Sequence, residues 1–413
     1  MTYTINRTPK DSSTSVTSPK GFRSGAATCG LKDKGVMDVA LILSDHECSG
    51  AGVFTRNEIV AAPVIVDRQM LTDDPTKLRG VVANAGIANA CTGPKGLEAC
   101  KRMQELAAVC AGCAPEQMLV LSTGVIGVQL DLDKIAVGIE HACRHLSANN
   151  GKDTARAIMT TDTHPKHTAV SVDLPGGKVT IGGIAKGSGM IHPNMATMLV
   201  VLTTDAAVPA EDLDGMLRAA VDRSFHHISI DGDTSTNDTV LILANGASGV
   251  TLNEGAAETD FEEALDAICV ELAQAIVRDG EGASKFITLQ VCGARSQDEA
   301  LRLARTIATS PLVKTAFAGG DPNWGRILAA AGRANVSLDS GSLALWIASG
   351  KYDDLQLVDE GMPLDYDESL AEAIFKENEI RVRLDMGLGQ ADTTVWTCDL
   401  THEYVSINAD YRT

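Results

Sequence analysis

Short apolar runs, separated by polar or glycine-rich turns, recur along the whole chain and predict β-strands as the main elements. Clear examples are VMDVALILSD (36–45), QMLVLSTGVIG (117–127), TMLVVLTTDA (197–206) and TVLILANGA (239–247). Runs this apolar are typical of strands in sheets that helices cover. The run EIVAAPVIVDR (58–68) has the same character and is also predicted to be a strand.

Three segments have the spacing of helices. In residues 96–110 and 262–277, apolar side chains recur three and four positions apart, which predicts helices with one buried face. A third helix is expected to begin at Asp321, because aspartate is a good N-cap and Pro322 suits the first helical position. Between two of the apolar runs, Pro175-Gly176-Gly177 predicts a hairpin turn. Helices and strands intermixed in this way predict an α/β (α+β) fold.

Length and charge limit the classes of partner. The chain has 413 residues, enough for two or three domain-sized units, and 44% of them are hydrophobic, enough for a large core. The formal net charge of −19 argues against nucleic acid or an anionic membrane as a partner. No apolar run reaches the ~18 residues that indicate a membrane-spanning helix.

Two further features bear on the compartment. Residues 1–20 are rich in serine and threonine and lack the apolar segment of a secretory signal, so a flexible leader is expected. The ten cysteines lie at irregular spacings, mostly in apolar contexts, which favours reduced thiols of a cytoplasmic protein over a disulfide framework. Cys110 and Cys113 form a CxxC pair, for which ordinary buried thiols are expected and a redox or metal role is the alternative.

The run KGSGMIHPNMATML, residues 186–199, carries the most specific chemical signal. Glycines, a serine and a proline precede an apolar strand that opens with Thr197, which indicates a conformationally special loop. If the Ala196–Thr197 bond is cut, Thr197 has a nucleophilic hydroxyl and a free α-amine that can serve as its base. The alternative is a strand threonine whose hydroxyl is satisfied locally.

A second candidate lies in LSTGVIG, residues 121–127. A strand is expected to end at Thr123 and Gly124, where the glycine lets the backbone turn and expose an N–H and the threonine adds a hydroxyl. Two such donors can form an oxyanion hole. An ordinary turn at the end of a strand explains the same residues.

Three polar runs are compatible with ligand binding. IMTTDTHPK (158–166) and DGDTSTNDT (231–239) group hydroxyl and carboxylate side chains, which suits either a polar turn network or a small polar ligand. The second run lacks the spacing of an EF-hand, so no metal site is expected there. In RDGEGASK (278–285), Glu281 lies between two glycines and is expected to face an open site, while Gly280 suits a helix cap.

Together and in this order, these runs resemble the glutamate N-acetyltransferase (ornithine acetyltransferase) family of arginine biosynthesis. The resemblance rests on ANACTG, STGVIG, IMTTDT, KGSGMIHPNMATML, DGDTSTNDT, DGEGASK, SPLVKTAFAGGDPNWGRI and the C-terminal CDLTHEYVSINADYRT, and it extends over about residues 21–413. Each run by itself is modest evidence, whereas the ordered set is specific.

The resemblance implies an enzyme that cuts its own Ala196–Thr197 bond, so that residues 21–196 become an α chain and residues 197–413 a β chain. It implies a ping-pong reaction in which N-acetylornithine acetylates Thr197, ornithine leaves, and glutamate accepts the acetyl group. Thr197 matches the family's nucleophile, and Thr123 and Gly124 match its oxyanion hole. The family's substrate-binding positions correspond to Thr160, Lys186, Thr197, Glu281, Asn408 and Thr413.

The resemblance also implies the architecture and the assembly. The family's fold is a layered helix–sheet–sheet–helix sandwich, partly like N-terminal nucleophile hydrolases, with a smaller C-terminal α/β region. The expected assembly is an α2β2 heterotetramer without metal or cofactor, and some family members also take the acetyl group from acetyl-CoA. Two other function classes remain: a self-cleaving amidase or aminopeptidase, in which water replaces glutamate, and a non-enzymatic binding protein.

Overall fold

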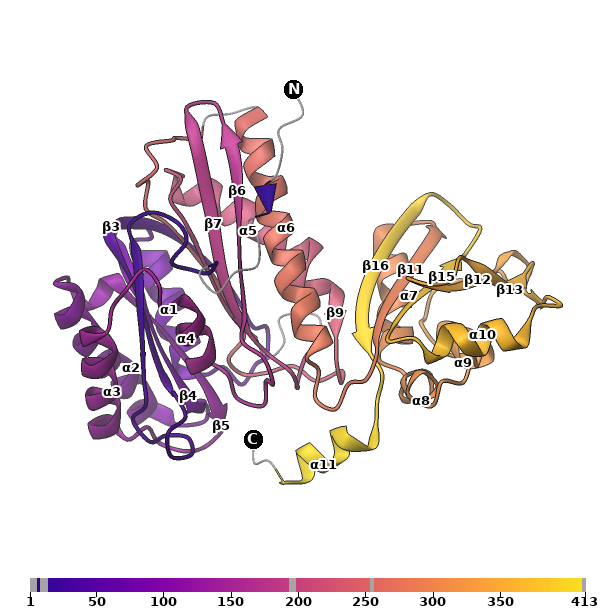
Figure 1. Ribbon diagram of the computed structural model, residues 1–413, viewed down its shortest axis with the longest axis horizontal. Coiled ribbons are helices and arrows are strands. Elements are labelled where there is room, and N and C mark those ends of the chain that lie inside the picture. The colour runs from indigo at the N-terminus through magenta and orange to yellow at the C-terminus, as the bar shows by residue number, and fades with distance from the viewer. Residues whose placement is uncertain (1–5, 8–13, 193–197, 253–255, 411–413) are drawn as a thin grey trace. The chain divides into compact units, whose positions relative to one another are not determined.

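The structure is a computed structural model that describes residues 6–7, 14–192, 198–252 and 256–410. The chain divides into two units, both drawn in Figure 1. The first consists of the residues up to His226 together with Asp233–Ile276, and the second of His227–Gly232 together with the residues from Val277 to Arg412. No low-complexity linker in the sequence marks this division.

The first unit contains a nine-stranded sheet, ordered β1-β6-β7-β8-β10-β3-β4-β5, with β2 paired to β3 beside this path. Its strands are β1 (Asn6–Arg7), β2 (Phe22–Ala27), β3 (Val39–Phe54), β4 (Leu78–Ile87), β5 (Met118–Val125), β6 (Lys166–Leu174), β7 (Gly177–Lys186), β8 (Leu199–Thr204) and β10 (Thr239–Ala244). Its helices are α1 (Ala62–Asp73), α2 (Gly93–Ala111), α3 (Leu132–Arg144), α4 (Gly151–Ala157), α5 (Ala210–Arg223) and α6 (Ala256–Arg278). The predicted hairpin turn is confirmed, since Leu174 pairs with Gly177.

Strand β3 changes partners along its length and so divides the sheet into two halves. The first half contains β2, β4 and β5, and the second contains β10, β8, β7, β6 and β1. Residues 39–44 pair with β2, and residues 49–54 pair with β10. The pairing of β3 with β4 shifts register between Leu43 and Cys48. Such a shift bends a strand and increases its twist.

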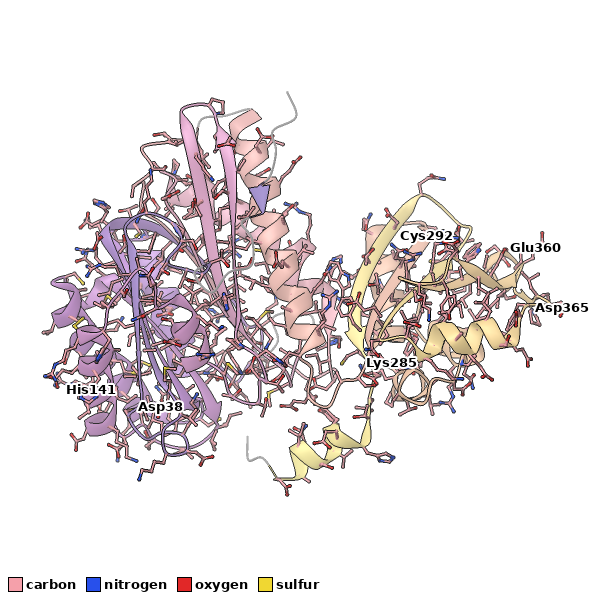
Figure 2. The ribbon with its side chains drawn as sticks, in the orientation of Figure 1. Asp38, His141, Lys285, Cys292, Glu360 and Asp365 are labelled. Carbon is pink, nitrogen blue, oxygen red and sulfur yellow. A yellow bond between two sulfur atoms is a disulfide. The ribbon has the colours of Figure 1, made fainter. Side chains whose placement is uncertain are left out.

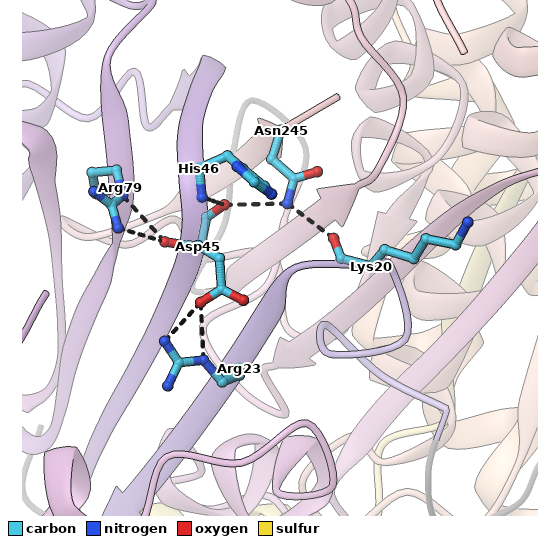
Figure 3. A network of polar contacts seen from close by, with 7 residues as sticks. Lys20, Arg23, Asp45, His46, Arg79 and Asn245 are labelled. Carbon is cyan, nitrogen blue, oxygen red and sulfur yellow. Dashed lines mark hydrogen bonds and ion pairs between the residues drawn. The ribbon is translucent and has the colours of Figure 1, made fainter. Parts of the chain in front are cut away.

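Side chains bind the backbone at this bend. The Ser44 carbonyl accepts two hydrogen bonds from the Arg79 guanidinium, at 3.1 and 3.0 Å. Figure 3 shows these bonds beside the ion pair of Arg23 with Asp45. The Asn245 amide donates to Ser44 Oγ at 3.2 Å. These donors satisfy polar groups where the ladder is interrupted.

The two halves of the sheet pack face to face. Ile42 of β3 and Leu121 of β5 share one buried cluster with Val201 of β8. Neighbouring residues on the first half point the other way, so that Val82 of β4 packs with Met103 of α2. This alternation follows from the period of two along a strand.

Helices cover the outer faces of both halves. On the second half, a Cβ atom added to Gly183 of β7 would lie 2.9 Å from Leu272 Cδ1 and 3.4 Å from Ile268 Cδ1, both on α6. The first unit is therefore a helix–sheet–sheet–helix sandwich, which confirms the predicted architecture.

The second unit contains a seven-stranded sheet, ordered β14-β13-β12-β15-β11-β16-β9. Its strands are β9 (Ile228–Ser229), β11 (Phe286–Ala294), β12 (Ala344–Ser349), β13 (Leu355–Asp359), β14 (Met362–Pro363), β15 (Glu379–Asp385) and β16 (Ala391–Cys398). Its helices are α7 (Gln297–Ala308), α8 (Pro311–Gly319), α9 (Trp324–Gly332), α10 (Glu368–Lys376) and α11 (His402–Asp410). One buried cluster joins Leu289 of β11 with Leu303 of α7 and Phe375 of α10. This unit is the predicted smaller α/β region.

One predicted element is wrong, and one predicted helix is present but begins later than expected. Residues 58–68 do not form a strand but contain the beginning of α1, with Pro63 in its first turn. A short apolar run cannot distinguish a buried strand from a buried helical turn, and the proline is the signal that decides it. The helix expected at Asp321 begins at Trp324, because Asn323 is the N-cap that accepts a backbone N–H.

The expectation of reduced thiols is wrong for two of the ten cysteines. Cys110 and Cys143 form a disulfide that joins the end of α2 to the end of α3. The two are 33 residues apart, so their pairing depends on how the helices pack and not on any local spacing. The other eight cysteines are free, including Cys113 of the CxxC pair.

Two other expectations concern the leader and membranes. Residues 14–17 lie in the segment expected to be a flexible leader, yet they are buried, and Val16 belongs to the cluster between the two sheet halves. Thr203 Oγ1 donates to the Val16 carbonyl at 2.7 Å, which fixes this segment to β8. Within the described residues, no helix is long and apolar enough to cross a membrane.

Candidate functional site

Thr123 and Gly124 lie near the end of β5, although the strand continues to Val125. Thr123 is buried. Gly124 has a φ of 129°, and a Cβ atom added to it would lie 2.2 Å from the backbone carbonyl carbon of Gly86 on β4. Glycine is therefore required here both by its φ and by the close approach of the neighbouring strand.

Lys186, the last residue of β7, reaches Thr123. Only 2% of Lys186 is exposed, and its Nζ lies 3.3 Å from Thr123 Oγ1. An ammonium group can only donate, so the hydroxyl oxygen accepts this hydrogen bond and keeps its own hydrogen to donate elsewhere. The pair combines a hydroxyl donor with a buried positive charge, an arrangement suited to stabilising a developing oxyanion.

Asp162 connects the end of β7 to the loop that contains Thr160. Its side chain is fully buried, and Oδ1 accepts hydrogen bonds from Lys166 Nζ at 2.6 Å and from the Gly187 N–H at 2.7 Å. Its Oδ2 accepts from the Thr160 N–H at 3.0 Å. Burial acts to raise the pKa of Asp162, but the ammonium groups of Lys166 and Lys186, with the Gly187 amide, lower it below its usual range. Asp162 is therefore a charged group that fixes Thr160 beside the end of β7.

Lys32 adds a third ammonium group to this region. Its Nζ donates to the carbonyls of Ala157 at 3.3 Å and Met159 at 2.9 Å, just before the Thr160 loop. Burial lowers the pKa of Lys32 to about 8, against the opposing effects of Asp38 and Asp162. The Asp38 carboxylate, labelled in Figure 2, accepts the backbone N–H of Lys32 at 3.2 Å and holds this loop in place.

In the second unit, Glu281 and Asn408 contact each other. Asn408 on α11 donates from Nδ2 to Glu281 Oε2 at 2.7 Å. The segments approach closely at Gly282, which has a φ of 66° and where an added Cβ atom would lie 2.5 Å from the Tyr404 nitrogen. Thr401 Oγ1 donates to the Gly282 carbonyl at 2.6 Å. The structure thus brings together two of the residues predicted to bind substrate.

Three predicted site residues lie outside the described part of the chain: Ala196, Thr197 and Thr413. The description resumes at Met198, one residue before β8. The cleavage site and the nucleophile therefore stay predictions.

Sequence reasoning does not single out Asp162 or Lys32. The run that contains Asp162 is predicted to be either a turn network or a ligand site, and in the structure Asp162 accepts hydrogen bonds from the N–H groups of Thr160 and Gly187. The proximity of Asp162 to Lys166, four residues later, was an available signal for an ion pair. Lys32 has no such signal, because a lysine in a polar loop is usually solvated.

Comparison with known proteins gives matches that span both units. A model of the ArgJ family matches residues 23–413. The "Arginine biosynthesis bifunctional protein ArgJ" of Symbiobacterium thermophilum is 48% identical over 402 residues, which cover 96% of this chain and 98% of that protein. The "Glutamate N-acetyltransferase" of Methanocaldococcus jannaschii is 44% identical over 405 residues, which cover 96% and 98%. The "Arginine biosynthesis bifunctional protein ArgJ, mitochondrial" of Heterostelium pallidum is 44% identical over 411 residues, which cover 96% and 94%.

Proposed function

The chain belongs to the ArgJ family, and from this premise we propose that it transfers the acetyl group of N-acetyl-L-ornithine to L-glutamate through an acetyl-Thr197 intermediate. It is an acyltransferase of arginine biosynthesis. The family match over residues 23–413 carries this conclusion. The hydrogen bond between Lys186 and Thr123, next to Gly124, supports the acyl-transfer chemistry.

The chain first activates itself by cutting the Ala196–Thr197 bond. The Thr197 hydroxyl attacks the Ala196 carbonyl carbon, the C–N bond breaks as the nitrogen takes up the hydroxyl proton, and an ester forms. Water then hydrolyses the ester, which leaves the Ala196 carboxylate and a free α-amine on Thr197. This amine, with a reference pKa of about 7.7–8.0, can act as a general base near neutral pH.

Acetyl transfer follows in two similar halves. The α-amine takes the Thr197 hydroxyl proton as the oxygen attacks the acetyl carbonyl of N-acetylornithine, and it then gives the proton to the departing ornithine nitrogen. The Thr123 hydroxyl and the Gly124 N–H donate to the oxyanion formed in this step. The amine of glutamate attacks the acetyl ester in the second half, releases the Thr197 hydroxyl and leaves as N-acetylglutamate.

The remaining site residues bind the two amino acids. Both substrates carry an α-carboxylate, and the buried ammonium of Lys186, with the polar groups of Thr160, is suited to attract it. Glu281 is suited to attract the amino group of ornithine, and its hydrogen bond with Asn408 orients the carboxylate. We assign Thr413 to the same binding role from the family motif.

The assembly and the compartment are part of this proposal. The two chains of one precursor stay together and pair as an α2β2 heterotetramer in the cytoplasm. Light scattering coupled to gel filtration measures the mass of the assembly and tests the heterotetramer.

The decisive experiment joins an intact mass spectrum of the denatured protein to an acetyl-transfer assay. Two species with the masses of residues 1–196 and 197–413, and N-acetylglutamate formed from N-acetylornithine, are the expected result. Thr197→Ala should give one uncut chain without activity, whereas Thr197→Ser keeps a hydroxyl and is expected to cleave. Release of acetate without N-acetylglutamate would identify an amidase instead. Acetyl-CoA supplied in place of N-acetylornithine tests the second donor.

A further inference from the structure

The end of the polar run DGDTSTNDT forms a buried connection between β5 and β8. Asn237, Asp238 and Thr239 are buried in the first unit and lead into β10, which pairs in parallel with β8. Neither the resemblance nor the proposed reaction assigns these residues a role. Their hydrogen bonds reach the backbone directly beside two proposed catalytic residues.

Asp238 holds Met198, the residue that follows Thr197 in the sequence. Asp238 Oδ1 accepts the Met198 N–H at 3.1 Å, and the Thr239 N–H donates to the Met198 carbonyl at 3.0 Å. A continued parallel ladder would pair the Met198 N–H with the Asn237 carbonyl. That carbonyl instead accepts the Thr239 hydroxyl at 2.9 Å, and the Asp238 carboxyl takes over as the acceptor for Met198.

Asn237 holds the backbone that precedes Thr123. Its Nδ2 donates to the Ser122 carbonyl at 2.8 Å and to the Ala88 carbonyl at 2.6 Å. A side-chain amide nitrogen carries two hydrogens, so both are used by these two carbonyls. The adjacent side chains of Asn237 and Asp238 therefore bind the neighbours in sequence of Thr123 and Thr197.

We infer that Asn237 and Asp238 are positioning residues that hold the segment before Thr123 at a fixed separation from the segment after Thr197. This inference rests on the proposed function, because it takes Thr197 as the nucleophile and Thr123 as an oxyanion donor. Acyl transfer depends on the mutual placement of these groups, and a misplacement of about 1 Å can lower a rate about 100-fold. One buried turn binds the backbone at Ser122 and at Met198, and so sets the separation of these two segments.

The Asp238 carboxyl serves as a buried acceptor in this arrangement. It is completely buried, and its Oδ2 has no hydrogen-bond partner within the described part of the chain. Burial raises the pKa of Asp238 well above its usual range, against the opposing effects of the Met198 and Ser235 amides, the Thr55 hydroxyl and the Lys186 ammonium. An asparagine at this position would keep the shape and an acceptor for the Met198 N–H.

Asp67 offers a matched control in the same unit. It is also a fully buried carboxyl whose pKa burial raises, and its Oδ1 accepts one backbone N–H, from Val120 at 2.9 Å. Its Oδ2 likewise has no partner among the described residues. Asp67 binds the middle of β5 and not a strand end beside a catalytic residue, so its loss affects stability without moving the site.

The test compares Asp238→Ala, Asp238→Asn and Asp67→Ala in the full-length chain. For each variant, intact mass gives the rate of conversion into two fragments, kinetics give kcat and KM for N-acetylornithine, and thermal unfolding gives Tm. We expect Asp238→Ala to lower both the cleavage rate and kcat about 10- to 100-fold, with KM changed less than about threefold. Asp238→Asn should restore both rates to within about threefold of the wild type. Asp67→Ala should lose a similar amount of Tm yet cleave and turn over like the wild type.

Three results would overturn the inference. Asp238→Ala could react like the wild type, or Asp67→Ala could be slowed as much as Asp238→Ala at an equal loss of Tm, which would make the effect one of stability. Asp238→Asn could also be as slow as Asp238→Ala, which would mean that the carboxyl group itself is required and not an acceptor for the Met198 N–H. A wild-type chain that neither cleaves nor transfers acetyl overturns the proposed function itself, and this outcome is independent of any difference between variants.

Discussion

Lys186 Nζ donates a hydrogen bond to Thr123 Oγ1 over 3.3 Å, and this contact joins the end of β7 to the end of β5. Both residues are buried, so the ammonium acts in a region of low dielectric constant where its charge has a large effect. Asp162 provides the negative charge that makes such a buried cation tolerable, and it shares that charge with Lys166. Asp162 therefore interacts with the charges of both lysines. Lys166 forms an ion pair with it, whereas Lys186 donates its hydrogen bond to Thr123.

Replacing Lys186 is expected to affect the reaction more than the fold. Lys186→Met removes the charge beside Thr123, and we expect kcat/KM for N-acetylornithine to fall about 10²- to 10³-fold. Lys166→Met is the matched control, because Lys166 forms the 2.6 Å ion pair with Asp162 and does not contact Thr123 in the described hydrogen bonds. Breaking that pair should cost about 3–5 kcal/mol of unfolding free energy. Kinetics and urea unfolding of both variants test this prediction. If Lys186→Met and Lys166→Met lose equal activity at equal losses of stability, the role given to Lys186 is contradicted.

Gly124 should not tolerate a side chain. In Gly124→Ala the new Cβ meets the Gly86 backbone at 2.2 Å, at a φ of 129° that an alanine rarely adopts. We expect at least about 3 kcal/mol of destabilisation and a loss of chain cleavage. Gly127→Ala provides the comparison, since Gly127 also has a positive φ of 81° but no atom within 4 Å of the added Cβ. Gly127→Ala should lower the free energy of unfolding by only about 1–2 kcal/mol and leave chain cleavage intact. Similar losses in the two variants, measured by thermal unfolding, would mean that the contact with Gly86 does not matter.

The disulfide between Cys110 and Cys143 should stabilise the first unit. It closes a loop of 33 residues, for which the chain-entropy relation gives about 3–4 kcal/mol. Cys110→Ser with Cys143→Ser is therefore expected to unfold at lower urea concentration than the wild type, and dithiothreitol should shift only the wild type. Cys113→Ser removes a free thiol close in sequence and should leave the urea midpoint unchanged. A wild-type midpoint that does not respond to the reductant would show that the bond is not formed.

Features encoded by adjacent residues could be predicted from the sequence, whereas contacts between distant elements could not. Thr123 and Gly124 lie near the end of β5, as the pattern of a strand followed by glycine predicts, although the strand continues to Val125. The predicted strand at residues 58–68 is wrong, since the same apolar run suits a buried helical turn. The ion pair of Asp162 with Lys166 is local, but the hydrogen bond from the Gly187 N–H to Asp162 and the disulfide depend on how distant elements pack, and no local sequence pattern predicts them.

Asp162 should make stability depend on pH in the acid range. Its pKa in the folded chain is lowered, while an unfolded aspartate has a pKa of about 3.9. The folded state therefore binds the proton less well, and the stabilisation is fully present above the unfolded pKa and is lost as pH falls through the folded pKa. The difference in unfolding free energy between wild type and Asp162→Asn should stay constant from about pH 5 to 7 and shrink below about pH 4. Urea unfolding across this range measures it, and a difference that grows toward low pH would contradict the lowered pKa.

Asp67 should give the opposite dependence. Burial raises its pKa in the folded chain well above the value of about 3.9 for an unfolded aspartate. Between these two values the unfolded chain releases the proton and the folded chain keeps it, so the wild type loses up to about 1.4 kcal/mol of stability for each pH unit gained. Asp67→Asn does not titrate but keeps an acceptor for the Val120 N–H, so its unfolding free energy should rise relative to the wild type as pH increases from 5 to 7. Because every other group titrates equally in the two proteins, the difference isolates Asp67. A difference that does not change with pH would mean that Asp67 is ionised in the folded protein, in spite of its burial.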